Sequence, residues 1–202
     1  MMTIMIIFVV LLLTSVDAFI GNAILKSNVR SLRKVDMMAG EFVTHFTTLS
    51  VPCGRGISLR DITTDVQGIV DSQGIKEGVV TVLSKHSTVS VCIQEFEPRF
   101  VDDARQFLLK LVPPDYPYLH NDLEFRVGPD DWPGGDEAWR EFRRTQPVNA
   151  HSHLIQMIVG TSESIPISEG AMQIGTYQNI IVVDADGVDK SRTICVQVMG
   201  TK

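Results

Sequence analysis

Gly78-Val-Val-Thr-Val-Leu-Ser-Lys-His-Ser-Thr-Val-Ser-Val-Cys-Ile-Gln94 contains two valine-rich runs, residues 78–84 and 89–94, on either side of four polar residues. Short runs of β-branched residues bounded by polar ones are typical of buried strands. A connection of four residues has the length of a hairpin loop. The stretch therefore predicts two antiparallel strands joined as a hairpin.

Periodic segments on both sides of this stretch extend the pattern. Residues 42–49 alternate with a period of two, as a strand does. Helices are expected at about residues 63–72, over about fourteen residues from Pro98, and at 139–144. Further strand-like segments are 57–62, 164–167, 172–184 and 192–199. A turn is expected at 184–189, between the last two strands. About seven strands and three or four helices in roughly 160 residues predict an α+β fold, a mainly antiparallel β-sandwich with flanking helices.

A further helix is expected in Pro147-Val-Asn-Ala-His-Ser-His-Leu-Ile-Gln-Met-Ile-Val-Gly160. Asn149 is a good N-cap residue, and Gly160 ends the apolar run. The positive end of such a helix favours an anion, and a histidine there can bind phosphate or move a proton. His151 and His153 point roughly 200° apart on a helix, so they cannot both bind one metal ion. The alternative is a capped amphipathic helix with no site.

Composition restricts the class of protein. The chain has 202 residues, of which 44% are hydrophobic and 21% charged, which argues against disorder and against a coiled coil. The net charge is −6 with no basic block beyond the N-terminal region, so we expect no nucleic-acid partner. The three cysteines form no CxxC pair, so neither a disulfide framework nor a zinc ribbon is indicated; they are Cys53, Cys92 and Cys195.

Residues 1–38 have the composition of a presequence. The apolar run at residues 4–13 is too short to span a membrane but suits a signal core within residues 1–18. Residues 19–38 are transit-like, because they begin with a stretch to Lys34 that holds four basic residues and no acidic one. Together they resemble the bipartite presequences that lead through the secretory pathway to algal plastids. Secretion, and an unstructured tail before a true start at Met37 or Met38, are the alternatives.

Residues 39–202 are then the mature domain, with no membrane segment expected. Removal of residues 1–34 leaves 14 basic against 23 acidic residues, so the mature protein is acidic.

Four polar residues are candidates for chemistry. His86 stands beside Ser87 and Thr88, which can share a phosphate with it. On a hairpin, Glu95 would approach His86 and form a carboxylate–imidazole pair suited to proton transfer. His120 and His153 are the other two, and a structural role explains each of the four better when it is taken alone, because surface Glu and strand-end His are common. No HExxH, P-loop or GxSxG motif is present, so a zinc site of three histidines would have to be assembled by the fold.

Two irregular segments remain. Residues 113–147 are rich in Pro, Gly, Asp and Trp, which is typical of a functional loop or lid. Residues 170–178, Gly-Ala-Met-Gln-Ile-Gly-Thr-Tyr-Gln, form a second polar cluster within a β region. A bulge and a turn would explain the second cluster without a site.

The order and spacing of nine short motifs resemble the YjbQ/UPF0047 family over residues 41–200. They are His86-Ser-Thr88, Ile93-Gln-Glu95, Tyr118-Leu-His-Asn121, Asn149-Ala-His-Ser-His-Leu154, Gly160-Thr-Ser162, Ile165-Pro-Ile167, Gly170, Ile174-Gly-Thr-Tyr-Gln178 and Val196-Gln-Val-Met-Gly200. The insert at residues 130–146 looks like the longer form of photosynthetic organisms. The sequence departs from the family pattern at Ser87, Gln94 and Tyr177, where threonine, asparagine and tryptophan are usual.

The resemblance implies a compact antiparallel α+β fold and a homotrimer with a polar cleft near the subunit interface. It selects His153 rather than His151, because the family pattern Ala-His-Leu falls on residues 152–154. Residues that match its recurring polar positions are His86, Glu95, His120 and Asn149.

The family label implies a thiamine-phosphate synthase-like transferase. Such an enzyme joins a pyrimidine methyl diphosphate to a thiazole phosphate and releases pyrophosphate, with a divalent ion such as Mg²⁺ on the diphosphate. In this interpretation His86, Glu95 and His153 are catalytic. The substrate-binding residues would be Ser87, Thr88, Asn149, Thr176 and Gln178.

Two other functions are kept as alternatives. One is a metal-dependent hydrolase or phosphatase that holds Zn²⁺ or Mg²⁺ with His86, His120 and His153. The other is a non-catalytic trimer that binds a phosphorylated metabolite.

Overall fold

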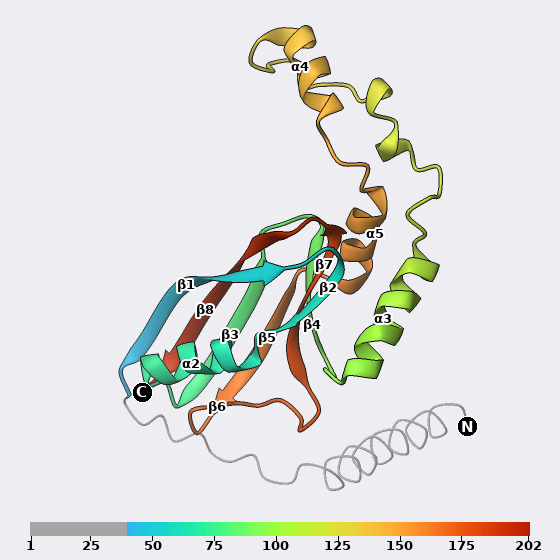
Figure 1. Ribbon diagram of the computed structural model, residues 1–202. Coiled ribbons are helices and arrows are strands. Elements are labelled where there is room, and N and C mark those ends of the chain that lie inside the picture. Colours follow the sequence, from blue (N-terminus) through green and yellow to red (C-terminus); the bar gives the residue numbers. More distant parts are fainter. Residues whose placement is uncertain (1–39) are drawn as a thin grey trace, which may run out of the picture. The chain divides into compact units, whose positions relative to one another are not determined.

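Eight strands form two antiparallel sheets in residues 40–202, the part of the chain that the computed structural model describes (Figure 1). The strands are β1 (Phe42–Cys53), β2 (Gly56–Asp61), β3 (Glu77–Ser84), β4 (Val89–Gln94), β5 (Ser162–Ser168), β6 (Ala171–Met172), β7 (Asn179–Gly187) and β8 (Lys190–Thr201). The helices are α2 (Thr63–Gln73), α3 (Pro98–Leu111), α4 (Gly135–Arg144) and α5 (Ala150–Val159), with 3₁₀ turns η1 (Leu119–Asn121) and η2 (Leu123–Phe125). The predicted presequence lies outside the described residues.

One sheet has the strand order β1-β8-β3-β5-β6 and the other has the order β2-β7-β4. All strand pairs are antiparallel, which confirms the predicted fold class. The predicted hairpin of β3 and β4 is wrong, because β3 pairs with β8 and β5 whereas β4 pairs with β7. Residues 85–88 therefore carry the chain from one sheet to the other. Each valine-rich run thus obtains a facing sheet that buries it.

Two apolar clusters hold together three layers, which are the five-stranded sheet, the three-stranded sheet and the helices α3 and α5. The first lies between the sheets and includes the fully buried Val80, Val82 and Val182, with Val66 and Val70 of α2 packed among them. The second lies on the other face of the three-stranded sheet, where α3 and α5 cover Ile181 and its neighbours (Figure 1). Alternate residues of β7 serve the two clusters, so this strand is apolar on both faces. No helix among residues 40–202 is long and apolar enough to cross a membrane.

The helices at residues 63 and 98 begin where the sequence predicts. Glu97 caps α3 by accepting hydrogen bonds from the backbone N–H groups of Arg99 and Phe100 at 3.0 and 2.8 Å. Gly74 ends α2 in the left-handed conformation, with φ of 65°.

The strand predicted at residues 172–184 is wrong in its bounds. Residues 173–178 make a turn, in which Gly175 N–H donates to Oε1 of Gln178 at 2.7 Å. The turn predicted at 184–189 is present but shorter than expected, because β7 continues to Gly187 and β8 begins at Lys190. Asp184 and Asp186 remain in the strand because the buried Arg192 of β8 binds both carboxylates.

Candidate functional site

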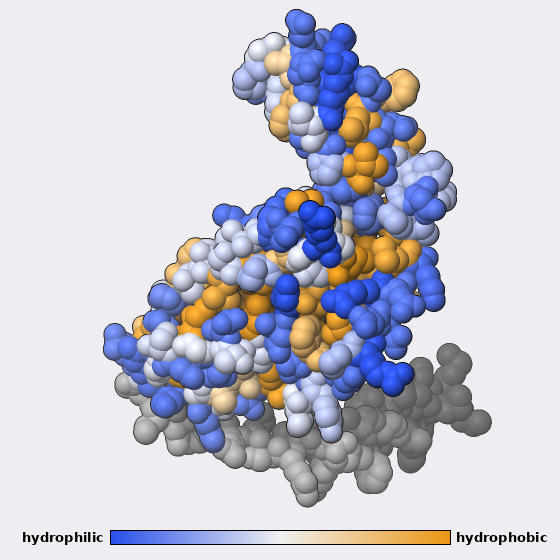
Figure 2. Space-filling view, in the orientation of Figure 1, coloured by the Kyte–Doolittle hydropathy of each residue, from blue (hydrophilic) through white to orange (hydrophobic). Residues whose placement is uncertain are grey.

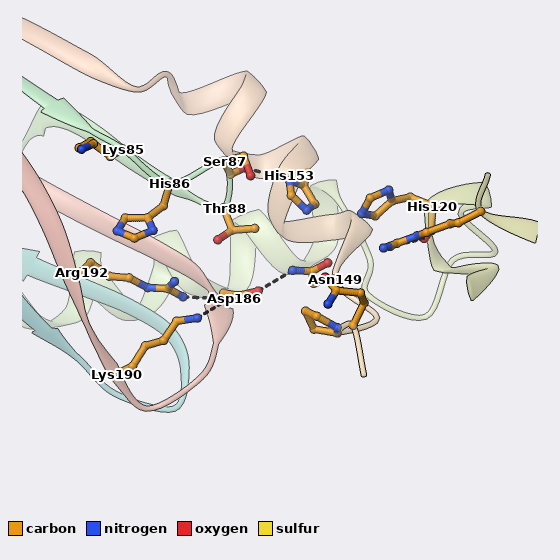
Figure 3. A pocket seen from close by; sticks show the side chains of 13 residues that line it. Lys85, His86, Ser87, Thr88, His120, Asn149, His153, Asp186, Lys190 and Arg192 are labelled. Atoms are coloured by element: carbon orange, nitrogen blue, oxygen red, sulfur yellow. Dashed lines mark hydrogen bonds and ion pairs between the residues drawn. The ribbon is translucent and has the colours of Figure 1, made fainter. Parts of the chain in front are cut away.

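A polar cavity of about 430 Å³ opens where the end of β3, the start of α5 and the β7–β8 turn meet (Figure 3). Its lining residues are Lys85, His86, Ser87, Thr88, His120, Arg126, Gln146, Pro147, Asn149, His153, Asp186, Lys190 and Arg192. Six of the residues expected at the site therefore line one cavity. They come from three segments, 85–88, 120–121 and 149–153.

Three expected site residues lie elsewhere. Glu95 follows the far end of β4 and is exposed, and it is about 20 Å along that strand from Thr88. Its expected approach to His86 is wrong because β3 and β4 do not form a hairpin. Thr176 and Gln178 lie in the turn before β7, at the same distant end of the three-stranded sheet. In one chain, these three residues and the cavity cannot bind the same small ligand.

A buried ion-pair network forms the floor of the cavity. Arg192 donates from Nη2 to Oδ1 of Asp184 at 2.9 Å and from Nε to Oδ2 of Asp184 at 2.5 Å. The same Nη2 also donates to Oδ2 of Asp186 at 2.9 Å. Burial by itself raises the pKa of Asp186, but hydrogen bonds from Asn149 and Arg192 outweigh it and hold the pKa below its ordinary value. Asp186 is therefore a fixed carboxylate on the cavity wall.

Asn149 serves this network instead of its own helix. Its Nδ2 donates to Oδ1 of Asp186 at 2.6 Å, and its side chain makes no capping bond (Figure 3). The expected capping role is wrong, and Oδ1 of Asn121 accepts from the N–H of Ala150 at 3.0 Å in its place. Ser152 fixes the helix to β7 by donating to the carbonyl of Ala185 at 2.7 Å. Residues 121 and 149 thus place the start of α5 against Asp186.

His86 is held as a neutral imidazole. Its Nε2 accepts a hydrogen bond from the N–H of Thr193 at 3.1 Å, so its proton sits on Nδ1. Burial, followed by the charges of Arg192 and Lys190, lowers the pKa of His86. A neutral His86 offers one N–H donor for a ligand.

His153 has the same tautomer as His86, with its proton on Nδ1. Its Nδ1 lies 3.1 Å from the carbonyl oxygen of Ser87, which can only accept, so Nδ1 carries the proton. The lone pair on Nε2 is then free to accept a proton. The His120 ring meets the His153 ring edge-on, with 4.8 Å between centroids (Figure 3). His151, which precedes it by two residues, does not line the cavity.

The three histidines share the cavity without converging on one point. His86 uses Nε2 for Thr193, while His120 and His153 pack against each other. Among residues 40–202, no group of three His, Cys, Asp or Glu side chains is arranged to hold a metal ion. As placed, the donors do not fit the predicted three-histidine metal site.

Sequence reasoning missed the charged residues of the cavity. They are Lys85, Arg126, Asp186, Lys190 and Arg192. Four of these are cations and one is an anion, in a chain whose net charge is −6. The sequence did carry one signal for these charges: Asp184 and Asp186 alternate in an apolar strand, and buried carboxylates require charged or hydrogen-bonding partners.

Three histidines have a lowered pKa, His86, His120 and His151, and these shifts predict a pH-dependent stability. Burial, followed by the charges of Arg126 and His153, lowers the pKa of His120 as well. The unfolded chain, whose histidines titrate near pH 6.5, then binds more protons than the folded chain as the pH falls. Stability should therefore decrease as the pH falls from about 6.5 through the lowered pKa values of His86, His120 and His151.

Urea denaturation at pH 7.5 and 5.5 measures this loss. The variant His86→Gln/His120→Asn should lose part of it, whereas His45→Asn on β1 should keep the wild-type dependence. An equal loss in wild type and the double variant would contradict the assignment.

Comparison with known proteins places this chain in a family. Residues 47–201 match the family model described as UPF0047 protein YjbQ-like. A UPF0047 protein from Methanothermobacter thermautotrophicus is 33% identical over 165 residues, which cover 81% of this chain and 99% of the relative.

Two solved structures share the fold. A YbjQ-like protein of unknown function from Sulfolobus solfataricus P2 aligns with a TM-score of 0.66 and 28% identity, covering 79% of this chain and 99% of that one. A hypothetical protein from Aeropyrum pernix K1 aligns with a TM-score of 0.64 and 28% identity, covering 77% and 98%. The chain belongs to the YjbQ-like UPF0047 family.

Proposed function

We propose that the cavity binds a phosphorylated small molecule and that the protein is a transferase of the thiamine-phosphate synthase type. The observation that carries the proposal is the gathering of cations in the cavity. Lys190 and Arg192 are paired with carboxylates, whereas Lys85 and Arg126 have no carboxylate within ion-pair distance in residues 40–202. Free lysine and arginine side chains are the usual partners of phosphate oxygens.

The charge of the whole chain strengthens this argument. A protein with net charge −6 repels phosphorylated molecules from most of its surface. A cation-lined hollow is then the place where such a ligand is held. The hydroxyls of Ser87 and Thr88 and the Nδ1–H of His86 add hydrogen bonds to its oxygens.

The proposed reaction needs charge dispersal more than proton transfer. The thiazole nitrogen donates its lone pair to the pyrimidine methylene carbon, the C–N bond forms, and the C–O bond breaks. The electron pair of that bond leaves with the pyrophosphate. Lys85 and Lys190 would stabilise the charge that develops on this leaving group. Nε2 of His153 would accept a proton from the pyrimidine amino group as positive charge grows on the ring, and it would return that proton to the amino group once the new C–N bond has formed.

A metal ion would enter this reaction with the substrate. Both oxygens of Asp186 are already bound by Asn149, Arg192 and Lys190. Mg²⁺ commonly binds substrate phosphates and keeps several waters, so a diphosphate can bring it without a protein cage. The cavity supports this arrangement better than a hydrolase that needs three converging histidines.

The experiment is a turnover assay on the purified chain. The protein receives the pyrimidine methyl diphosphate, the thiazole phosphate and Mg²⁺, and pyrophosphate release and thiamine phosphate are both measured. Turnover that requires both substrates would support the transferase. Release of inorganic phosphate from one substrate alone would support a phosphatase, and binding without turnover would support a non-catalytic protein.

We also propose that the chain forms a homotrimer. The outer face of the five-stranded sheet exposes large apolar side chains, among them Phe42 at 67% and Phe46 at 60%. The register places Met199 and Leu83 on the same face, with uncharged Thr44, Thr81 and Gln197 between them. An exposed apolar patch without charges is typical of a protein–protein interface.

Light scattering should then give three times the chain mass of 22.4 kDa. Phe46→Lys should reduce that mass, because it places a charge in the patch. A monomeric wild type would contradict the proposal.

A further inference from the structure

Residues 113–147, here called the arm, contribute a cation to the cavity. Arg126 lies on the arm just after η2, and its Nε and Nη2 donate to the carbonyl oxygen of His120 at 2.8 and 2.5 Å. A guanidinium has five N–H groups, so three remain for another partner. Since Arg126 lines the cavity and none of the described carboxylates pairs with it, these groups are available to a ligand.

A helix of the arm holds the backbone of Arg126 in place. The carbonyl oxygen of Arg126 accepts hydrogen bonds from Nε1 of Trp139 at 3.0 Å and from Nη1 of Arg143 at 3.1 Å. Arg143 also binds Glu124 at 3.2 Å. The chain passes so close to the indole that a Cβ at Gly128 would lie 2.6 Å from Cγ of Trp139. Contacts with α4 therefore hold the chain both before Arg126, at Glu124, and after it, at Gly128.

An aromatic cluster makes the arm a packed unit. The ring centroids of Trp132 and Trp139 are 4.9 Å apart, and those of Trp132 and Phe142 are 4.8 Å apart. Figure 2 shows apolar side chains at the surface over this segment, among hydrophilic ones. A short surface segment with its own aromatic core can hold one backbone carbonyl rigidly.

The cations of the cavity fall into two groups. Lys190 and Arg192 lie on β8 and Lys85 directly follows β3, whereas Arg126 comes from the arm. Figure 3 shows Lys85 at one end of the site and His120, whose carbonyl Arg126 binds, at the other, with Asp186 between them. The carboxylate of Asp186 has both oxygens bound by Asn149, Arg192 and Lys190 and offers no donor to an anion, so the donors for a ligand lie towards the two ends.

We propose that Arg126 is a second anion-binding pole and that the ligand of the cavity carries two separate phosphoryl groups, one for each end. Trp139 and Arg143 are positioning residues, which act by fixing the carbonyl of Arg126. The inference rests on the proposed function, since it divides the same cavity into two subsites.

Calorimetric titration of the full chain with inorganic phosphate and with fructose 1,6-bisphosphate tests this proposal. Wild type should bind the bisphosphate more tightly than phosphate. Arg126→Gln should weaken bisphosphate binding about tenfold, the usual effect of losing a charge-assisted hydrogen bond, and change phosphate binding less than about twofold. The selectivity is the ratio of bisphosphate affinity to phosphate affinity. If a variant loses this selectivity while its unfolding temperature stays unchanged, the loss comes from the second subsite and not from general destabilisation.

Two neighbouring arginines of α4 supply a matched pair of variants. Arg143→Met should reduce the bisphosphate selectivity, because Arg143 holds the carbonyl of Arg126. Arg144→Met should leave it unchanged, because within residues 40–202 Arg144 pairs only with Glu141. Trp132 and Trp139 are the only two tryptophans of the chain, so their fluorescence should change on bisphosphate binding.

The outcomes separate the two proposals. A wild type that binds neither probe overturns the proposed function and the inference with it. A wild type that binds both probes equally, with no effect of Arg126→Gln or Arg143→Met, overturns the inference and leaves a phosphate-binding cavity.

Discussion

His153→Asn should lower pyrophosphate release by about 100-fold or more, which is the usual contribution of a positioned proton-transfer group. Asparagine can keep the bond that Nδ1 of His153 makes to the carbonyl of Ser87, so the local structure is retained. It has no group in place of Nε2, which is the nitrogen left free to accept a proton. The effect should appear in kcat, because His153 acts on the reacting groups and not on the phosphate.

The matched control is His151→Asn, two residues earlier on the same helix. His151 does not line the cavity, so turnover should stay within about threefold of wild type, a change too small for lost acid–base catalysis. Equal losses in both variants would mean that the helix start has been disturbed. Full activity of His153→Asn would remove His153 from the mechanism.

Asp184→Asn should lower the free energy of unfolding by about 3–5 kcal/mol, the usual cost of breaking a buried ion pair. Arg192 is 2% exposed and Asp184 is fully buried, so water cannot replace the lost charge. Asp186 would remain as the one carboxylate on Arg192, and its position in the cavity would change. Binding of inorganic phosphate should therefore weaken in the same variant.

Urea denaturation measures the change, with Asp102→Asn as the control. Asp102 pairs with Arg105 at 2.6 Å on the surface of α3, and exposed pairs contribute about 1 kcal/mol or less. A loss below about 1 kcal/mol for Asp184→Asn would show that the buried network has little energetic weight.

Local sequence patterns were enough for the elements that depend on neighbouring residues. The cap at Glu97 and Pro98 and the stop at Gly74 act within one helical turn, so the bounds of α3 and α2 followed from the sequence. The alternation of residues 42–49 is likewise a property of one strand. The order of the short motifs also identified the family, because each motif retains its spacing.

The tertiary structure alone decided which of these elements meet. Alternation shows which side of a strand is buried but not which strand lies beside it, so the separation of β3 and β4 and the distance between His86 and Glu95 could not be read locally. Arg126 reaches the cavity through contacts with Trp139 and Arg143, 13 and 17 residues away. The sequence by itself determined the elements, the family and the histidines. The charges around those histidines were set by long-range packing, since a buried arginine binds whichever carboxylates the fold brings within reach.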